Sequence, residues 1–100
     1  MGAPTTPGTA SETTVTVRYW AAIKAAAGRA EDVVSSTAGQ SVADVLTDVR
    51  GRHADNPRFE QVLSVCSLLL DERPIGTTDP AAVPVSAGAL LDVLPPFAGG

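Results

Sequence analysis

Apolar and polar residues alternate along residues 13–19, and this period of two predicts a strand with one buried face. The segment is also rich in β-branched residues, which favour strands. Residues 20–27 then change to helix-forming types, and Gly28 is placed to end a short helix. Residues 31–36 contain two adjacent valines and predict a second strand, the hairpin partner of the first. The buried face of the first strand would consist of Val15, Val17 and Tyr19.

The clearest amphipathic helix is predicted to begin at Ser41. The Ser41 side chain can accept a hydrogen bond from the first helical turn, and Asp44 three residues later approximates a capping box. The apolar residues that follow recur at helical spacing. His53 lies with two arginines near the C-terminal end, where positive charge is favourable, so we expect it to be a helix-end residue. The apolar stripe consists of Val42, Val45, Leu46 and Val49.

The second half of the chain predicts mainly strands. Residues 57–63 are compatible with a helical turn. The nearly continuous apolar run over residues 65–70 predicts a strand buried on both faces. The remaining segments are a turn over residues 71–74, a short edge strand at Ile75, a loop over residues 77–88 and a final strand over residues 89–94.

Together these elements predict an α+β roll, with a mixed sheet of four to five strands and one main helix packed across it. The helix would cover one sheet face and leave the other to solvent or a partner. If Leu91 and Val93 face the helix, Leu90, Asp92 and Leu94 lie on the outer face. A contiguous apolar patch there would mark an interaction surface beside the start of the C-terminal tail.

The composition fits one small domain. Of the 100 residues, 44% are hydrophobic and 18% are charged, as in globular proteins. We predict a disordered leader over residues 1–12, a folded domain over residues 13–94 and a flexible tail over residues 95–100. The net charge of −4 comes without a basic cluster, which argues against a nucleic-acid partner. No apolar run approaches the ~20 residues of a membrane span and no signal peptide is recognisable, so we expect no membrane association and a cytoplasmic location.

Residues that could carry chemistry are few. Cys66 is the only cysteine and His53 the only histidine, which excludes an intrachain disulfide and predicts no metal site. Cys66 lies inside an apolar run and is expected to be a small buried hydrophobic residue. The sequence leaves any further role of Cys66 and His53 open.

The C-terminal tail is the most informative segment for function. Pro95 and Pro96 fix the backbone φ and lack the N–H groups of a sheet ladder, so they end the last strand and stiffen the base of the tail. Gly99 and Gly100 have no side chains, so a carboxylate on this thread can enter a narrow active site. The whole segment is Pro95-Pro96-Phe97-Ala98-Gly99-Gly100. It predicts a carboxylate that is delivered to another protein.

The order of elements resembles the β-grasp fold of ubiquitin-like proteins, and specifically the sulfur-carrier family. The ending, in which two prolines and two further residues precede a diglycine, is most similar to the small subunits of molybdopterin synthases. The resemblance spans residues 15–100. Its strongest segments are residues 17–20 with Gly28, residues 41–46 and residues 88–100.

The resemblance implies that Gly100 is the reactive site. A ubiquitin-activating-like enzyme would use ATP to adenylate its carboxylate, and a sulfur donor enzyme would supply the sulfur of a C-terminal thiocarboxylate. The large subunit of molybdopterin synthase would use this sulfur to build the molybdopterin dithiolene. The chain would bind no cofactor and would act as the non-catalytic sulfur-donor subunit of a heteromer. Gly99 would allow access, and the partner-binding residues would be Pro95, Pro96, Phe97, Ala98, Leu90 and Leu94; Phe97 could instead pack on its own domain.

Three different functions stay open on the sequence alone. A ubiquitin-like protein modifier would use the same activation step and then join Gly100 to a lysine of a target. Lys24 is the only lysine of the chain, which disfavours the formation of modifier chains. A sulfur carrier for cysteine, thiazole or transfer-RNA thiolation is the second of these functions, and a ubiquitin-like binding domain with an inert tail is the third.

Overall fold

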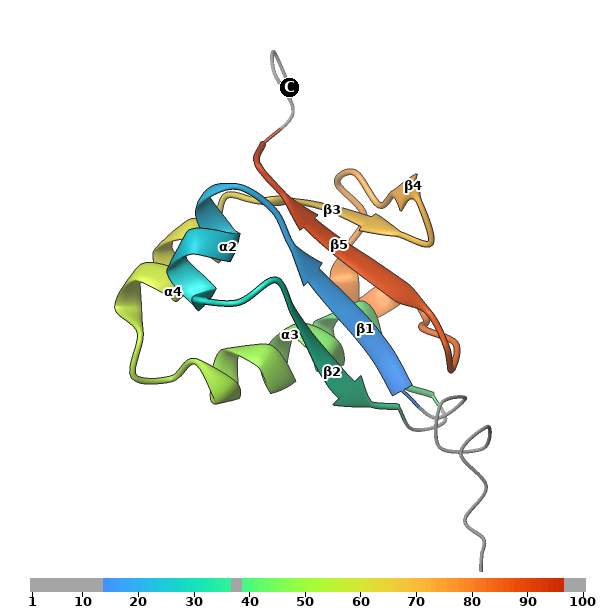
Figure 1. Ribbon diagram of the computed structural model, residues 1–100. Coiled ribbons are helices and arrows are strands. Elements are labelled where there is room, and N and C mark those ends of the chain that lie inside the picture. The colour runs from blue at the N-terminus through green and yellow to red at the C-terminus, as the bar shows by residue number, and fades with distance from the viewer. Residues whose placement is uncertain (1–13, 37–38, 97–100) are drawn as a thin grey trace, which may run out of the picture.

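The computed structural model describes residues 14–36 and 39–96, so the predicted leader over residues 1–12 lies outside the described residues. The described residues form a mixed sheet of five strands in the order β2-β1-β5-β3-β4 (Figure 1). The central strands β1 and β5 are parallel, and the other neighbouring pairs are antiparallel. The strands are β1 (Thr14–Tyr19), β2 (Glu31–Ser35), β3 (Ser67–Leu70), β4 (Arg73–Pro74) and β5 (Leu90–Leu94).

The main helix is α3 (Val42–Arg52), and it begins with the capping arrangement that the sequence predicts. The Asp44 backbone N–H donates to Ser41 Oγ at 3.3 Å, and the Ser41 backbone N–H donates to Asp44 Oδ2 at 2.8 Å. Both bonds satisfy N–H groups that a helix start otherwise leaves without partners. The predicted start of α3 is therefore confirmed.

Two shorter helices, α2 (Ala22–Ala27) and α4 (Pro57–Leu63), lie together at one end of the sheet (Figure 1). The Asn56 side chain links them, because its Nδ2 donates to the Ala26 carbonyl at 2.7 Å while its Oδ1 accepts from the Phe59 backbone at 3.1 Å. A short 3₁₀ turn, η1 (Pro80–Ala82), interrupts the long loop before β5. Within the described ranges, no helix is long and apolar enough to cross a membrane.

The core lies between the sheet and α3, and the predicted division of faces is confirmed. Leu91 and Val93 of β5 are fully buried, whereas Leu90 and Leu94 on the opposite face are half-buried. Each fully buried aliphatic side chain contributes about 1.5–3 kcal/mol to folding. The fully enclosed side chains are Val15, Val17, Tyr19, Ile23, Val34, Val42, Val45, Val49, Phe59, Leu91 and Val93.

Three predicted elements differ in detail from the structure. The short helix was expected over residues 20–27, but Trp20 continues the sheet by donating its backbone N–H to the Val93 carbonyl at 3.1 Å, so α2 begins two residues later. Strand β3 is half-buried throughout, because only one of its faces packs on the core. The edge strand is Arg73–Pro74 and not Ile75, because the intervening turn is so tight that pairing with β3 starts at once.

Gly51 offers a direct test of the α3 assignment. It is exposed inside the helix, its backbone is not left-handed, and an added Cβ would meet nothing within 4 Å. We expect Gly51→Ala to raise the free energy of unfolding by about 0.5–1 kcal/mol, because alanine loses less backbone entropy on folding. Gly28→Ala should have the opposite sign, because Gly28 has a φ of 78° that disfavours a Cβ. Urea unfolding of both variants measures the two changes.

Candidate functional site

The candidate site is the end of the sheet from which the chain continues into its tail. The last strand is held on both sides as far as its final residues, since Tyr19 of β1 is paired with Val93 and Ser67 of β3 with Leu94. Pairing on both sides holds the backbone of β5 in place. The base of the tail is therefore fixed in position relative to the sheet.

The first tail residues, Pro95 and Pro96, are both exposed. They follow β5 directly and, lacking backbone N–H groups, cannot extend its ladder. This agrees with the strand end that the sequence predicts. The remaining predicted site residues, Phe97, Ala98, Gly99 and Gly100, lie outside the described residues.

The outer face of the sheet carries apolar side chains near the tail. Leu94 lies there as predicted, and Trp20 is 44% exposed at the same end of the sheet. Val65, which is 60% exposed, lies two residues before the residue paired with Leu94. Trp20 was missed as a surface residue because it was assigned to the helix. The alternation of β1 does predict the exposure of Trp20, since Trp20 directly follows the inward-facing Tyr19.

The predicted patch of Leu90 and Leu94 is not continuous, because Asp92 lies between them on the same face of β5. Asp92 is only 4% exposed. Its Oδ1 accepts from Arg18 Nε at 2.8 Å and from Trp20 Nε1 at 2.8 Å, and its Oδ2 accepts from Arg18 Nη2 at 3.3 Å. The Arg18 guanidinium also lies 5.4 Å from the centre of the Trp20 ring. We call Arg18, Trp20 and Asp92 the Asp92 cluster.

The charge state of the Asp92 cluster follows from its contacts. Burial alone would raise the pKa of Asp92, but the hydrogen bonds from Arg18 and Trp20 and the charge of Arg18 outweigh it and lower the pKa. The hydrogen bond to Asp92 likewise raises the pKa of Arg18. Asp92 is therefore a carboxylate at neutral pH, and a carboxylate can only accept hydrogen bonds.

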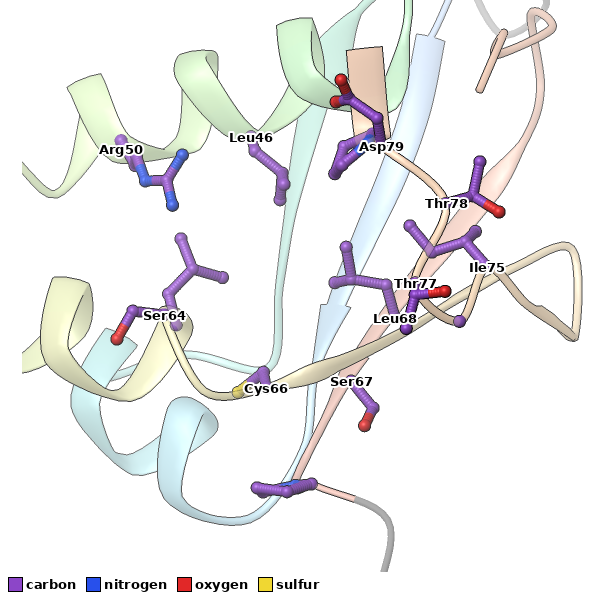
Figure 2. A pocket seen from close by; sticks show the side chains of 14 residues that line it. Leu46, Arg50, Ser64, Cys66, Ser67, Leu68, Ile75, Thr77, Thr78 and Asp79 are labelled. Atoms are coloured by element: carbon purple, nitrogen blue, oxygen red, sulfur yellow. The ribbon is translucent and has the colours of Figure 1, made fainter. Parts of the chain in front are cut away.

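A groove of about 540 Å³ lies between α3 and β3, and Pro96 forms part of its lining. Figure 2 shows Leu46 and Arg50 reaching from α3 toward the segment of Cys66 and Leu68, with Ile75 next to Leu68. The Cys66 thiol donates to the Val62 carbonyl at 3.2 Å, and burial raises its pKa. A thiol with a raised pKa is a weak nucleophile at neutral pH. Cys66 packs against the core as expected of a hydrophobic residue, but it is half-buried and not fully buried.

A buried network at the C-terminal end of α3 explains His53. Asp32 is 6% exposed on the inner face of β2, where its Oδ2 accepts from the Tyr19 hydroxyl at 2.7 Å and lies 2.9 Å from His53 Nε2. Arg29 Nη2 is 2.7 Å from Asp32 Oδ1, and the His53 ring stacks on Phe59 at 4.1 Å between centroids. His53 follows the last residue of α3, as predicted, and it links α3 to the β1–β2 hairpin.

The inward position of Asp32 was missed in the sequence, although the pattern contains it. Val34 faces the core, and a residue two positions earlier on the same strand must face the same way. Burial would raise the pKa of Asp32, but the hydrogen bonds from Tyr19, His53 and Arg29 lower it. Burial and the bond to Asp32 raise the pKa of Tyr19 well above its usual value, so its phenol stays a neutral donor.

The fold is that of the β-grasp class of ubiquitin-like proteins, as predicted. A solved structure of a putative molybdopterin converting factor subunit 1 from Pyrococcus furiosus has a TM-score of 0.69 at 18% identity, over 85% of this chain and 99% of the other. Small archaeal modifier protein 1 from Methanosarcina acetivorans gives 0.68 at 20% identity, over 88% and 97% of the two chains.

A third similar structure comes from a protein complex of subunits 1 and 2 of the molybdopterin-converting factor of Helicobacter pylori. Its TM-score is 0.57 at 22% identity, over 87% of this chain and 99% of the other. No protein-family model and no curated protein sequence matches the chain. The likeness to these carriers and modifiers is thus one of fold, and it extends over nearly their whole lengths.

Proposed function

We propose that this chain is a cytoplasmic ubiquitin-like sulfur carrier that acts as the small, sulfur-donating subunit of a molybdopterin synthase. The observation that supports this most is the fixed base of the tail. Strand β5 is paired on both sides up to Leu94, and the chain then leaves the sheet through two exposed prolines. The sequence that follows ends in Gly99 and Gly100, which can pass through a narrow channel because they lack side chains.

The proposed chemistry takes place at the Gly100 carboxylate. A carboxylate is a poor electrophile, so an oxygen of Gly100 first attacks the α-phosphorus of ATP, and pyrophosphate leaves. A sulfide equivalent from a sulfur donor enzyme then attacks the acyl carbon, AMP leaves, and a thiocarboxylate remains. Its sulfur is a stronger nucleophile than oxygen and forms a bond to the pterin precursor in the large subunit. Water then cleaves the acyl C–S bond, which leaves the sulfur on the pterin and returns Gly100 to a carboxylate. The bonds are made and broken in the partners' active sites, and this chain provides the carried group.

The partner surface would include the outer face beside the tail. The exposed Trp20 and the half-buried Leu94 provide apolar area at the base of the tail, and a partner that accepts the tail must cover that area. Leu90, the other proposed partner contact on β5, lies farther from the tail, on the other side of Asp92. The solved complex of subunits 1 and 2 from Helicobacter pylori supports a large-subunit partner for a chain of this fold.

Intact-mass analysis tests the proposal. The chain is incubated with an adenylating enzyme of the ubiquitin-activating type from the same organism, with ATP and with sulfide. The expected product is heavier by the difference between one sulfur and one oxygen atom. The carrier is then added to a molybdopterin synthase large subunit with the pterin precursor, and formation of the dithiolene is measured. An unchanged mass after complete consumption of ATP would refute the sulfur-carrier assignment.

A second candidate function is protein modification, which the likeness to small archaeal modifier protein 1 favours over a binding domain with an inert tail. The activation step would be the same, but Gly100 would end in an amide bond with a lysine of another protein. The same incubation with cell extract distinguishes the two, because a modifier appears attached to larger proteins. Attachment to Lys24 of a second copy would appear as a dimer that Lys24→Arg removes.

A further inference from the structure

The Asp92 cluster gives Trp20 an unusual combination of exposure and fixation. The Trp20 backbone N–H donates to the Val93 carbonyl at 3.1 Å, and its indole N–H donates to Asp92 Oδ1 at 2.8 Å. Both acceptors belong to β5, the strand that continues into the tail. The ring is nevertheless 44% exposed. Its orientation is therefore fixed relative to the base of the tail while it remains available for contact.

Position 92 of the sheet does not itself require a carboxylate. Burying a charge removes it from water, and replacing both members of a buried ion pair by apolar residues of similar size is often neutral for stability. The register places Leu69 of β3 opposite Asp92, and Leu90 and Leu94 are its neighbours on the same face of β5. An apolar side chain would therefore be compatible with these surroundings. What Asp92 adds is two oriented partners, Arg18 and Trp20.

We propose that Asp92 and Arg18 are positioning residues that hold the Trp20 ring in the orientation in which it binds the adenylating enzyme. This inference rests on the proposed function and identifies how its first partner is recognised. A large aromatic ring fixed before binding loses little rotational freedom on association, which favours its use as an anchor. The Arg18 guanidinium beside the ring restricts it further.

The surroundings also indicate the chemistry of the partner surface. Glu31 and Glu72 lie close enough to Arg18 to raise its pKa through their charge. The exposed ring thus lies beside one arginine and near two glutamates, in a chain of net charge −4. The fitting partner has an apolar pocket for the indole with basic residues at its rim.

The first experiment uses the fluorescence of Trp20, the only tryptophan of the chain. Quenching by acrylamide is measured for the full chain alone and with saturating adenylating enzyme without ATP. The enzyme's own tryptophans would interfere, so they are replaced by phenylalanine. Alternatively, the chain is labelled with 5-fluorotryptophan and its solvent exposure is followed by fluorine NMR. We expect binding to protect Trp20 from the quencher. In the uncomplexed chain, Asp92→Val should increase the mobility of the ring, seen as lower fluorescence anisotropy. A Trp20 that is equally accessible in the complex overturns the inference.

The second experiment separates positioning from stability by adenylation kinetics, measured as ATP–pyrophosphate exchange. We expect Asp92→Val to raise the KM for the carrier about tenfold with kcat unchanged, because the reacting carboxylate is not altered. Valine favours strands, and Arg18, whose side chain is 39% exposed, stays in contact with water when its partner is removed, so urea unfolding should show that the variant is still folded under the assay conditions. Arg18→Lys, which keeps the charge but loses the two-point contact, should raise KM by a smaller factor. Val33→Ala, an exposed substitution on β2 of the same face, is the control and should change neither parameter.

A double-mutant cycle decides whether Asp92 acts through Trp20. Trp20→Phe keeps a ring but removes the indole N–H, so Asp92 has nothing to orient in that background. The effect of Asp92→Val on KM should then disappear, whereas a general structural effect of Asp92→Val would persist and add to the effect of Trp20→Phe. Persistence of the full effect overturns the inference and leaves the proposed function intact. Failure of the original chain to be adenylated at any concentration would refute both.

Discussion

Deletion of Gly100 is expected to abolish sulfur transfer while the free energy of unfolding stays unchanged. One residue of extended chain spans about 3.5 Å, so the deletion draws the terminal carboxylate back from the partner's reacting groups by that distance. A displacement of only 1 Å can reduce a rate about 100-fold, and we expect at least that loss here. The measurement is the yield of thiocarboxylate by intact mass and of dithiolene with the large subunit.

The unchanged free energy of unfolding is expected because Gly100 lies beyond the folded core. The described core is complete at Val93, and Pro95 and Pro96 are already exposed. A variant with one alanine added after Gly100 should lose transfer as well, since the glycine carboxylate is then an internal amide. Gly51→Ala, far from the tail in sequence and on α3, should retain full transfer. Sulfur transfer at the original rate by the shortened chain would contradict both the required length of the tail and the role of Gly100.

Much of the fold could be predicted from local sequence because its signals are local. The Ser41–Asp44 capping box, the left-handed Gly28 and the alternation along β1 each depend on residues fewer than five positions apart. Each is present in the structure. The division of β5 into a core face and an outer face also follows from alternation alone, once α3 is known to cover one side.

The polar clusters depend on tertiary pairing and could not be predicted in the same way. Arg18 and Asp92 are 74 positions apart, and they meet only because β1 and β5 pair in parallel with these two residues in register. No local pattern specifies that register. The tail residues 97–100 lie outside the described residues, so the reactive site itself stays a prediction from sequence and resemblance.

Replacement of Asp32 by asparagine is expected to lower the free energy of unfolding by about 1.5–3 kcal/mol at pH 5–7, the range for hydrogen bonds to a charged group. Asparagine has the same shape, but its amide presents donors where Tyr19, His53 and Arg29 also donate. Arg29 is half exposed and can turn to water, so its ion pair adds little to the loss. Urea unfolding followed by circular dichroism measures the change. Asp48→Asn is the matched control: Asp48 forms an exposed pair with Arg52, and its loss should cost under about 0.5 kcal/mol.

The acid dependence of this difference identifies its cause. The contacts of Asp32 hold its pKa in the folded state below its unfolded value of about 3.9. A carboxyl group of this kind stabilises the fold fully above the unfolded pKa and loses that contribution as the pH falls through the folded pKa. The advantage of the original chain over Asp32→Asn should therefore be intact at pH 5 and shrink below about pH 4. A gap that stays constant down to pH 2 would contradict this cause, because it would show that the ionised carboxylate is not the source of the difference.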